Sequence, residues 1–503
     1  MTGVREQLPP EFVARAAEFA DPDEHEAFLR SFDQPRTRGV RANPMKLSAL
    51  ELAERLGVST TPVPWCPDGL VLDDGASLGG HPAHLAGLCY FQEPSAMAVV
   101  EALDPAPGWR VADLAAAPGG KTTQLAAAVG PEGLVVANDV SRKRLRALHD
   151  NLDLWGGANV VTTSRSLTEL AAAAVSASGG DGSGRDGFDG VVLDAPCSGE
   201  ALFRRDPAAI RHWSPAAVEG SAARQAELLV AAAALVRPDG VLVYSTCSFS
   251  QAENEERVTA FLAGHPGWTL EDCARRLGVD GGVPRSAYAT ELTARLWPHK
   301  GAGEGQFVAR FRRDGAAPVD RPPASAAAGR RRRPSSTTRN GRRGASGRSG
   351  PSQREVLAGW DGFRRANLWT FHPSLDGLTV VGDRLFARPR AGSPLPGVDT
   401  VRPGLPLGRL KPGRFAPDPA LATSLAADDA VRVDRWSLDD PRLDAFARGE
   451  SLPDDGPDGW VLVAYERWGL TWGYRTGGTL KNHVPPHLRR QAAAHSRRVS
   501  PPR

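Results

Sequence analysis

Cysteine is scarce in this sequence, with five residues among 503. Their irregular spacing does not fit a disulfide framework, so we expect free thiols in a reducing cytoplasm. No apolar run reaches the roughly eighteen residues that a membrane span needs, and "LLVAAAALV" (Leu228–Val236) is far shorter. The amino-terminal stretch "MTGVREQLPPEF" lacks the basic-then-apolar pattern of a secretion signal. We therefore expect a cytoplasmic protein with no membrane partner.

Positive charge is concentrated in one segment. The formal net charge is +3, and residues 329–350, "GRRRRPSSTTRNGRRGASGRSG", hold eight arginines and no acid. Removing those eight charges leaves −5 for the rest of the chain. An arginine run is typical of contact with a polyanion such as RNA, although a solubilising linker can have the same composition.

Composition divides the chain into successive regions. Large apolar residues are almost absent from one of them, which therefore cannot offset the entropy of ordering. The predicted regions are a mostly helical amino-terminal region (1–105), an alternating strand and helix domain (106–312), a disordered Arg-rich linker (313–352), a small globular domain with short strands (353–490) and a basic disordered tail (491–503).

The second region reads as repeated strand–helix units. Apolar strands are predicted within 109–115, 133–140, 159–163, 188–196 and 240–248. Helices alternate with them, one of them opening at Ser214-Pro215. Ser250 and Glu253 have the spacing of a capping box at a further helix start. This alternation predicts a parallel sheet covered on both faces, with its ligands at the carboxyl ends of the strands.

That edge of the sheet would bind a nucleoside. In "DLAAAPGGKTT" the phosphate-loop pattern fails, because Ala115 stands where a glycine is required, and no G-x-G-x-x-G is present. The small residues of this turn let the backbone approach a ligand, and Asp139 ends the next strand where it can accept hydrogen bonds from ribose hydroxyls. S-adenosylmethionine is the first candidate and a dinucleotide the weaker one, while a plain α/β turn is the structural alternative.

Two cysteines, Cys197 in "LDAPCSGEALF" and Cys247 in "LVYSTCSFS", follow two of the strands. Methylation of a pyrimidine at C5 is difficult unless a thiolate first adds to C6 and makes C5 nucleophilic. A second polar group assists elimination, and an acid such as Asp194 can hold the N3/N4 edge of cytosine. The alternative is that these thiols are buried small hydrophobes, which is our expectation for Cys66, Cys89 and Cys273.

Several motifs together resemble those of the Nop/Sun family of RNA 5-methylcytosine methyltransferases, and the tail resembles that of its bacterial small-subunit rRNA branch. The match covers nearly the whole chain except the arginine linker. The motifs are "RGVRANPMK" (Arg38–Lys46), "YFQEPSAM" (Tyr90–Met97), "DLAAAPGGKTTQLA", "ANDVSRKRLRALHDNL", "LDAPCSGEALFRRDP", "YSTCSFSQAENE", "LWPHKGAGEGQFVARF", "VRPGLPLGRLKPGRFAPDPALA" and "GWVLVAYERWGLTWGYRTGGTLKNH".

The resemblance implies a role for each cysteine. It makes Cys247 the nucleophile, and Cys197 the group that assists release of the methylated base. It makes Asp194 and Lys121 further catalytic residues, with Lys121 reaching the cofactor or the target edge unless it is only a solvated lysine at a helix start. The S-adenosylmethionine site that it implies comprises Ala115, Ala116, Ala117, Pro118, Gly119, Gly120, Lys121, Asp139, Arg144, Ser164 and Asp194.

Two positions depart from the family pattern. The first loop begins Ala-Ala-Ala where many relatives have a cysteine, and this difference weakens the resemblance only slightly. After the third strand, where many relatives place an acid near the adenine, this chain reads "TTSRSLTEL", so the Ser164 hydroxyl is the replacement we consider.

RNA would reach this site unpaired or flipped out, because a paired cytosine is inaccessible. The amino-terminal region and the tail domain are the expected RNA-binding parts. Trp460, Trp468 and Trp472 can stack on bases, but Trp460 begins an apolar strand and is better explained as a core residue. The stretch "RWGLTWGYRTGGTLKNH" is the better candidate for an RNA-facing surface.

These observations predict an α/β fold: a Rossmann-like class I methyltransferase domain, an amino-terminal α+β RNA-binding region and a small β-rich, PUA-like carboxyl-terminal domain. The expected activity is S-adenosylmethionine-dependent methylation of cytosine C5 in RNA, which the resemblance narrows to small-subunit rRNA. A tRNA enzyme of the same chemistry and a non-catalytic ribosome-assembly factor are the alternatives. We expect a monomer without a metal site.

Overall fold

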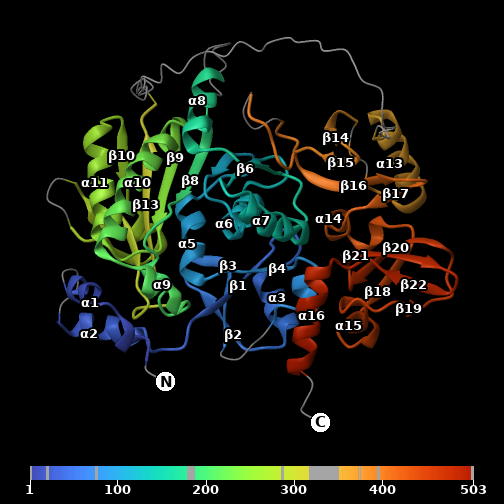
Figure 1. Cartoon of the computed structure of the whole chain (residues 1–503), viewed down its shortest axis with the longest axis horizontal. Helices are drawn as coiled ribbons and strands as arrows, with labels where there is room; N and C mark the ends of the chain where they lie inside the picture. The colour runs from blue at the N-terminus through green and yellow to red at the C-terminus, as the bar shows by residue number, and fades with distance from the viewer. Residues whose placement is uncertain are drawn as a thin grey trace, which may run out of the picture.

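The computed structural model describes residues 3–17, 22–73, 78–177, 187–284, 288–315, 350–371, 373, 375–392 and 397–499. Within them the strands form sheets of four, nine, four and five strands, arranged around a central helix pair, α6 and α7 (Figure 1). Most of the linker (316–349) lies outside the described residues, as does the glycine-rich stretch 178–186 between α8 and β8. Among the described residues, no helix has both the length and the apolarity that a membrane crossing requires.

The nine-stranded sheet is the scaffold of the predicted site. Its strand order is β11-β12-β13-β9-β8-β5-β6-β7, with β10 paired to β13. Strands β5 to β9 pair in parallel, whereas β13 runs antiparallel to β9. The elements of this region are β5 (Arg110–Asp113), α6 (Gly120–Val129), β6 (Leu134–Asn138), α7 (Arg142–Trp155), β7 (Val160–Thr163), α8 (Leu167–Ala177), β8 (Phe188–Asp194), η2 (Glu200–Leu202), α9 (Pro207–His212), α10 (Pro215–Ala233), β9 (Val236–Thr246), η3 (Gln251–Glu253), α11 (Glu255–Gly264), β10 (Trp268–Glu271), α12 (Cys273–Leu277), β11 (Asp280–Gly281), η4 (Thr290–Leu292), β12 (Ala294–Leu296) and β13 (Gln306–Arg313).

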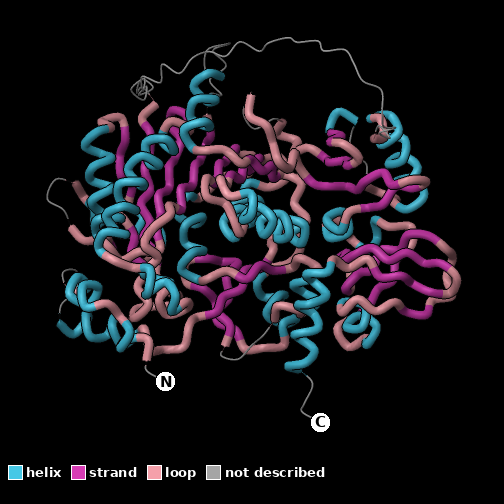
Figure 2. Tube along the Cα trace, viewed as in Figure 1, coloured by secondary structure: helices cyan, strands magenta, loops and turns pink. Residues whose placement is uncertain are grey.

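Both faces of this sheet are buried, because successive strand residues enter different apolar clusters. On β9, Leu242 packs into the cluster beneath α8, α10 and α11, while Val241 and Val243 join the cluster beneath α5, α6 and α7. The tube in Figure 2 shows helices on either side of these strands. The predicted strands and the helix opened by Ser214 and Pro215 are confirmed, and Ser214 accepts a hydrogen bond from the Ala217 amide.

The amino-terminal region is α+β. Its sheet has the order β2-β3-β1-β4, and α5 connects it to the nine-stranded sheet. The elements are η1 (Arg5–Gln7), α1 (Pro10–Ala16), α2 (Pro22–Ser31), β1 (Arg38–Ala42), α3 (Ala49–Leu56), β2 (Thr60–Val63), β3 (Cys66–Leu72), α4 (Pro82–Leu85), β4 (Cys89–Phe91) and α5 (Pro94–Leu103).

The carboxyl-terminal region, expected as one small domain, contains two sheets. The first has the order β14-β15-β16-β17 and the second β18-β20-β21-β22-β19. The elements are α13 (Gln353–Asn367), η5 (Leu375–Gly377), β14 (Leu378–Val381), β15 (Arg384–Ala387), β16 (Leu405–Lys411), β17 (Arg414–Pro417), α14 (Pro419–Thr423), η6 (Ala427–Asp429), β18 (Val433–Trp436), α15 (Pro441–Ala447), β19 (Leu452–Pro453), β20 (Gly459–Tyr465), β21 (Trp468–Thr476), β22 (Thr479–Asn482) and α16 (Pro486–Val499). Because α16 extends to Val499, the expected unstructured tail is wrong for residues 491–499.

Strand β20 lies between the core of the amino-terminal region and the core of the first carboxyl-terminal sheet, and it contributes side chains to both. Its Trp460 and Leu462 side chains pack with α13 and the first carboxyl-terminal sheet. The alternating residues Val461 and Val463 pack instead with the core of the amino-terminal region. Because side chains alternate between the two faces of a strand, β20 packs against the amino-terminal core on one face and the first carboxyl-terminal sheet on the other.

The last turn of α7 is where all three parts meet. The Asn43 side chain donates a hydrogen bond to the Trp155 carbonyl, and the Arg41 guanidinium carbon lies 4.9 Å from the Trp155 ring centroid. Gly87, at φ +66°, approaches the Leu154 carbonyl so closely that a Cβ would overlap it. From the carboxyl-terminal region, the Thr423 backbone packs on Gly156. The methyltransferase-like sheet is thus held from both sides.

Candidate active site

Two adjacent parallel strands bring the two rim cysteines together. Strands β8 and β9 pair in a register that sets Asp194 beside Ser245. The loops after these strands carry Cys197 and Cys247, and the two Sγ atoms lie 3.2 Å apart. Both cysteines are partly exposed, whereas Cys66, Cys89 and Cys273 are buried as expected. The structure thus separates two accessible thiols from three that serve packing.

Three donors surround the Asp194 carboxylate. Lys121 Nζ lies 2.7 Å from Oδ2, while Ser245 Oγ and Gln306 Nε2 lie 2.8 and 3.1 Å from Oδ1. Burial opposes the charge on Lys121, but Asp194, Asp113 and Cys247 together outweigh it, so the pKa of Lys121 is raised. The ion pair therefore keeps a cation and an anion next to the cysteines.

The environment of the Cys197 thiol favours its protonated form. A hydrogen bond with Cys247, followed by burial and the nearby charges of Glu253 and Asp194, raises the pKa of Cys197 well above its ordinary value. A thiol in that state is a poor nucleophile and can serve as a proton donor. This environment makes Cys197 a weak candidate for attack on a substrate.

The turn after β5 forms the predicted cofactor edge. It contains a cis peptide bond between Ala117 and Pro118, and Gly119 adopts φ +114° before α6 begins. The Ala117 amide donates to Asp139 Oδ2 at 3.3 Å, and Ala116 donates to the Asn138 carbonyl. At Gly119 a side chain would meet Leu148, so a residue without Cβ is needed for the helix to begin so close to α7.

Asp139, Arg144 and Ser164 lie at this edge in different roles. Asp139 is buried at the end of β6, and its Oδ1 atom accepts from the Ser141 amide. Arg144 contacts Asp139 at 3.4 Å and donates to the Ala117 carbonyl at 2.5 Å, so it holds the turn as well as facing the site. Ser164 follows β7 and is half-buried. Asn138, which the sequence did not indicate, links this loop to β6 through the Arg165 amide and carbonyl.

The donor set fits a nucleoside sulfonium such as S-adenosylmethionine. The turn has only small side chains up to Lys121, and carboxylates end β5, β6 and β8. Asp113 Oδ1 is buried and finds no well-aligned donor among the described residues, and burial raises the pKa of Asp113 to about 6. Backbone amides, a strand-end acid and a partly unsatisfied carboxylate together suit ribose hydroxyls and a positively charged ligand.

Glu253 is a site residue that sequence analysis assigned wrongly. The expected capping box with Ser250 does not form, since Ser250 makes no side-chain cap contact. The Glu253 carboxylate is instead fully buried and accepts from the Ser198 amide at 2.9 Å and from the hydroxyls of Ser198 and Ser248, both at 2.5 Å. It also accepts from Gln225 at 2.9 Å.

A second buried carboxylate, Glu200, supports the same loops. It accepts from the Phe249 amide at 2.8 Å and from Trp213 Nε1 at 2.9 Å, and Ser248 Oγ, which donates to Glu253, lies 3.1 Å from it. Burial first, together with the nearby Glu253 charge, raises the pKa of Glu200. Aromatic rings from α1 and α2 pack behind this network, so the amino-terminal helices shield the loops that carry the cysteines.

Gln306 is another site residue that the sequence did not indicate. It begins β13, far along the chain from Asp194, and is buried. Its approach to Asp194 depends on the antiparallel pairing of β13 with β9, which places Phe307 beside Thr246. The three tryptophans considered for RNA stacking are, in contrast, all buried, so Trp468 and Trp472 are core residues like Trp460.

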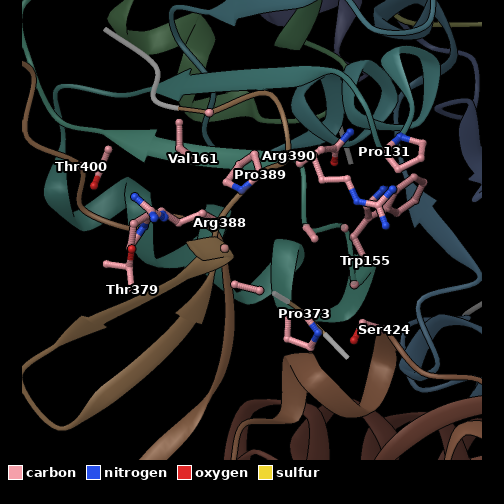
Figure 3. Close-up of a pocket in the computed structure, with 18 of the residues that line it drawn as sticks. Pro131, Trp155, Val161, Pro373, Thr379, Arg388, Pro389, Arg390, Thr400 and Ser424 are labelled. Atoms are coloured by element: carbon pink, nitrogen blue, oxygen red, sulfur yellow. The ribbon is translucent and has the colours of Figure 1, made fainter. Parts of the chain in front are cut away.

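A cavity of about 1320 Å³ opens elsewhere, between the methyltransferase-like sheet and the first carboxyl-terminal sheet. Figure 3 shows Pro131 and Trp155 on one side of it and Thr379 and Arg388 on the other. Pro131 precedes β6, so this wall lies at the amino ends of the parallel strands. Ligands of such sheets bind at the opposite ends, which leaves the cysteine rim as the candidate active site.

A parallel sheet extended by the antiparallel β13, with a small-residue turn after β5 and an acid at the end of β6, defines a Rossmann-like methyltransferase. The described rim meets that definition. The chain belongs to the RsmB/F family of 16S rRNA methyltransferases. The model of 16S rRNA methyltransferase RsmB/F matches residues 100–312, and that of the RsmF amino-terminal domain matches 8–94. The RsmF first carboxyl-terminal domain and the RsmF PUA domain match 362–425 and 435–490, in agreement with the two sheets.

Individual relatives agree along almost the full length. The ribosomal RNA small subunit methyltransferase F of Erwinia tasmaniensis is 32% identical over 96% of both chains. Its namesake from Escherichia coli is 32% identical over 92% of both chains. A crystal structure of a methyltransferase homologue from Pyrococcus horikoshii matches with a TM-score of 0.52 at 28% identity, covering 62% of this chain and 98% of that one. The predicted fold class and family are therefore confirmed.

Proposed function

We propose that this protein transfers a methyl group from S-adenosylmethionine to C5 of a cytosine in small-subunit ribosomal RNA, with Cys247 as the nucleophile. The observation that carries the proposal is the 3.2 Å contact between Cys197 and Cys247 beside the Lys121–Asp194 ion pair. Membership of a family of 16S rRNA methyltransferases supports both the reaction and the substrate class.

The cofactor would lie along the turn from Ala115 to Lys121, with Asp139 at its ribose. When bound, S-adenosylmethionine supplies the methyl group that the activated C5 receives. The protein's part is to hold that ligand through backbone amides of the turn and the strand-end carboxylate. The Arg144 bridge between Asp139 and the Ala117 carbonyl keeps the turn in place while the ligand exchanges.

The two thiols divide the work on the base. Cys247 forms a bond from sulfur to C6, which places an electron pair on C5. After methylation, the C5 proton leaves to a base, the electron pair restores the C5–C6 double bond, and the bond from Cys247 to C6 breaks. Cys197 assists this release, because its raised pKa keeps a proton within reach of the departing Cys247 sulfur.

Asp194 and Lys121 hold the target edge. The Asp194 carboxylate, fixed by three donors that include Lys121, accepts from the cytosine amino group. Uracil presents an oxygen at the same place, which the carboxylate would repel. The pair therefore favours cytosine over uracil.

Covalent trapping tests this function. Purified protein is incubated with S-adenosylmethionine and small-subunit rRNA containing 5-fluorocytidine, then analysed on a denaturing gel. Because fluorine at C5 cannot leave as a proton, a covalent adduct persists as a shifted band. We expect the band with the wild type and with Cys197→Ala, and none with Cys247→Ala. Cys273→Ala, at a buried thiol away from the rim, is the matched control and should trap normally.

Each other outcome redirects the proposal. A band that survives Cys247→Ala but disappears with Cys197→Ala would reverse the two roles. A band with 5-fluorocytidine tRNA and none with rRNA would make the protein a tRNA enzyme. Cofactor binding without any band would favour the non-catalytic assembly factor. The cytoplasmic location and the monomeric state stay predictions, to be checked by fractionation and by light scattering.

A further inference from the structure

A groove separate from the active site lies between α13, the β16–β17 hairpin and strand β20. Its volume is about 610 Å³, and its floor includes Phe363, Phe415 and Trp460. Gly362 and Gly413 line it and have nothing within 4 Å of an added Cβ, so the groove is open at both residues. In Figure 1 the hairpin lies beside β20, which is where the two carboxyl-terminal sheets meet.

Cations gather along one rim of this groove. Lys411 and Arg414 line it and are exposed. After burial, the causes that lower the pKa of His483 are all positive charges, those of Arg414, Lys411, Arg489 and Lys481. The acid among the described lining residues is Glu355, whose carboxylate already accepts from the Ser352 amide and hydroxyl. The rim is therefore electropositive.

Aromatic rings lie beneath one of these cations, Arg414. The Arg414 guanidinium carbon is 5.0 Å from the Tyr474 ring centroid and 5.8 Å from that of Trp460. Trp460 pairs with Tyr474 across the β20–β21 ladder, and Tyr474 with Lys481 across β21–β22. Tyr474 and His483 are only half-buried. The floor rings are buried and tilted, at 41° between Phe363 and Phe415 and at 76° between Trp460 and Tyr474, so they form an apolar lining and not an open stacking face. An apolar groove beside an arginine and lysines combines space for a base with charges that bind its phosphate.

We propose that this groove binds an unpaired RNA nucleotide, its base within the apolar groove and its phosphate at Arg414 and Lys411. The proposal rests on the proposed function, since it takes RNA as the substrate, and adds a second point of contact outside the active site. An acidic protein segment would match the charges but would not need the apolar groove between them.

Filling the groove tests the floor. Gly362→Leu places a side chain where nothing stands within 4 Å, and glycine in the middle of a helix is unfavourable, so this variant should fold at least as well as the wild type. Gly220→Leu in α10, also with open space, is the matched control. With fluorescein-labelled dodecaadenylate, which contains no cytosine, fluorescence anisotropy should show about tenfold weaker binding for Gly362→Leu only.

Reversing a charge tests the rim. Arg414→Glu should weaken dodecaadenylate binding and flatten the dependence of log Kd on log salt by about 0.7 for each phosphate that the variant no longer binds. Arg409→Glu, exposed on the same hairpin but not among the residues that line the groove, is the control. The proposal that the groove binds RNA would be refuted by either of two results. One is an equal effect of the test and control variants on dodecaadenylate binding, and the other is unchanged binding in Gly362→Leu.

Failure of this site and failure of the proposed function give different results. At saturating 5-fluorocytidine rRNA, Gly362→Leu and Arg414→Glu should still form the Cys247 adduct in full amount. If the protein binds dodecaadenylate through the groove but never forms the adduct, the groove proposal stands and the proposed methyltransferase activity is refuted. If the adduct forms normally but binding does not depend on the groove, the methyltransferase activity stands and the groove proposal is refuted.

Discussion

The hydroxyl oxygens of Ser198 and Ser248 lie 3.1 Å apart, and each serine directly follows one of the two rim cysteines. Both hydroxyls donate to the same carboxylate oxygen, Oε2 of Glu253. The cysteine loops are therefore linked by a buried acid immediately behind the sulfur atoms. Charge-assisted hydrogen bonds of this kind are about twice as strong as neutral ones, which makes Glu253 a positioning residue for the thiol pair.

Glu253→Gln should slow methylation without weakening cofactor binding. The amide keeps the shape but turns a donor toward the Ser198 amide, so we expect kcat about tenfold lower or worse, in line with ~1–3 kcal/mol for an unsatisfied buried group. Steady-state methylation and calorimetric cofactor binding measure the two effects. Glu256→Gln, exposed on the following helix α11, should change neither. An unaltered kcat for Glu253→Gln would remove its positioning role.

Lys121 and Asp194 should act as one unit. Lys121→Met and Asp194→Asn each break the 2.7 Å ion pair, and each should lower kcat about a hundredfold. The double variant should be scarcely worse than either single one, because residues in one network are not additive. Strictly additive losses in this double-mutant cycle would show that the two side chains act independently.

Cys197→Ala should accumulate adduct on ordinary rRNA. If Cys197 assists release, its loss leaves Cys247 bonded to C6 after methylation, so a denaturing gel should show a band without any fluorinated base. The band should need S-adenosylmethionine and should be absent from Cys197→Ala/Cys247→Ala. Free turnover by Cys197→Ala at the wild-type rate would assign release to another group.

Arg41 couples the amino-terminal region to the cofactor turn. It donates to Thr123 Oγ1 at 2.7 Å, to Gln92 Oε1 at 3.0 Å and to the Gly120 carbonyl at 3.1 Å. Arg41→Met leaves these acceptors without their donor, so we expect unfolding to need ~2–4 kcal/mol less and cofactor binding to weaken. Urea titration and calorimetry measure both; Arg38→Met on the same strand should have the smaller effect on cofactor affinity.

Acid should destabilise the fold through a buried histidine. Burial lowers the pKa of His84 to about 4, against 6.5 for an ordinary histidine. Below pH 6.5 His84 binds a proton in the unfolded chain but stays neutral in the native state. The free energy of unfolding therefore falls from its value above pH 6.5 as the pH is lowered toward 4. The loss from this residue approaches ~3 kcal/mol. Urea unfolding at pH 7.5 and 5.0 should show it, and His84→Gln should flatten it, unlike His212→Gln at an exposed site.

The sequence was informative wherever function depends on the residues just after a strand. The ends of β5, β6, β8 and β9 could be located from apolar runs and turn residues, so Asp139, Asp194 and both cysteines could be assigned to one edge. Parallel strands guarantee that their carboxyl ends share an edge, so no register was needed. The family resemblance then supplied the order of events that position alone left open.

The sequence did not predict contacts that depend on strand pairing or on burial. Gln306 reaches Asp194 only through the register of an antiparallel strand, which local pattern does not encode. Glu253 has the spacing of a helix cap, yet the structure buries its carboxylate and surrounds it with four donor groups from the cysteine loops and α10. The division of the carboxyl-terminal region was hidden because Trp460 and Leu462 of the second sheet complete the core of the first.

The convergence of three parts on the last turn of α7 has a consequence for which RNAs fit. Contacts from Asn43 and from Thr423 fix both flanks against Trp155 and Gly156, so the distance from the cysteines to the outlying groove is set by the protein. The protein would then select RNAs by the distance between two nucleotides, the target cytosine and the one in the groove. The sequence between these two nucleotides could vary freely in evolution, whereas one inserted nucleotide or one longer stem would move the cytosine away from the active site.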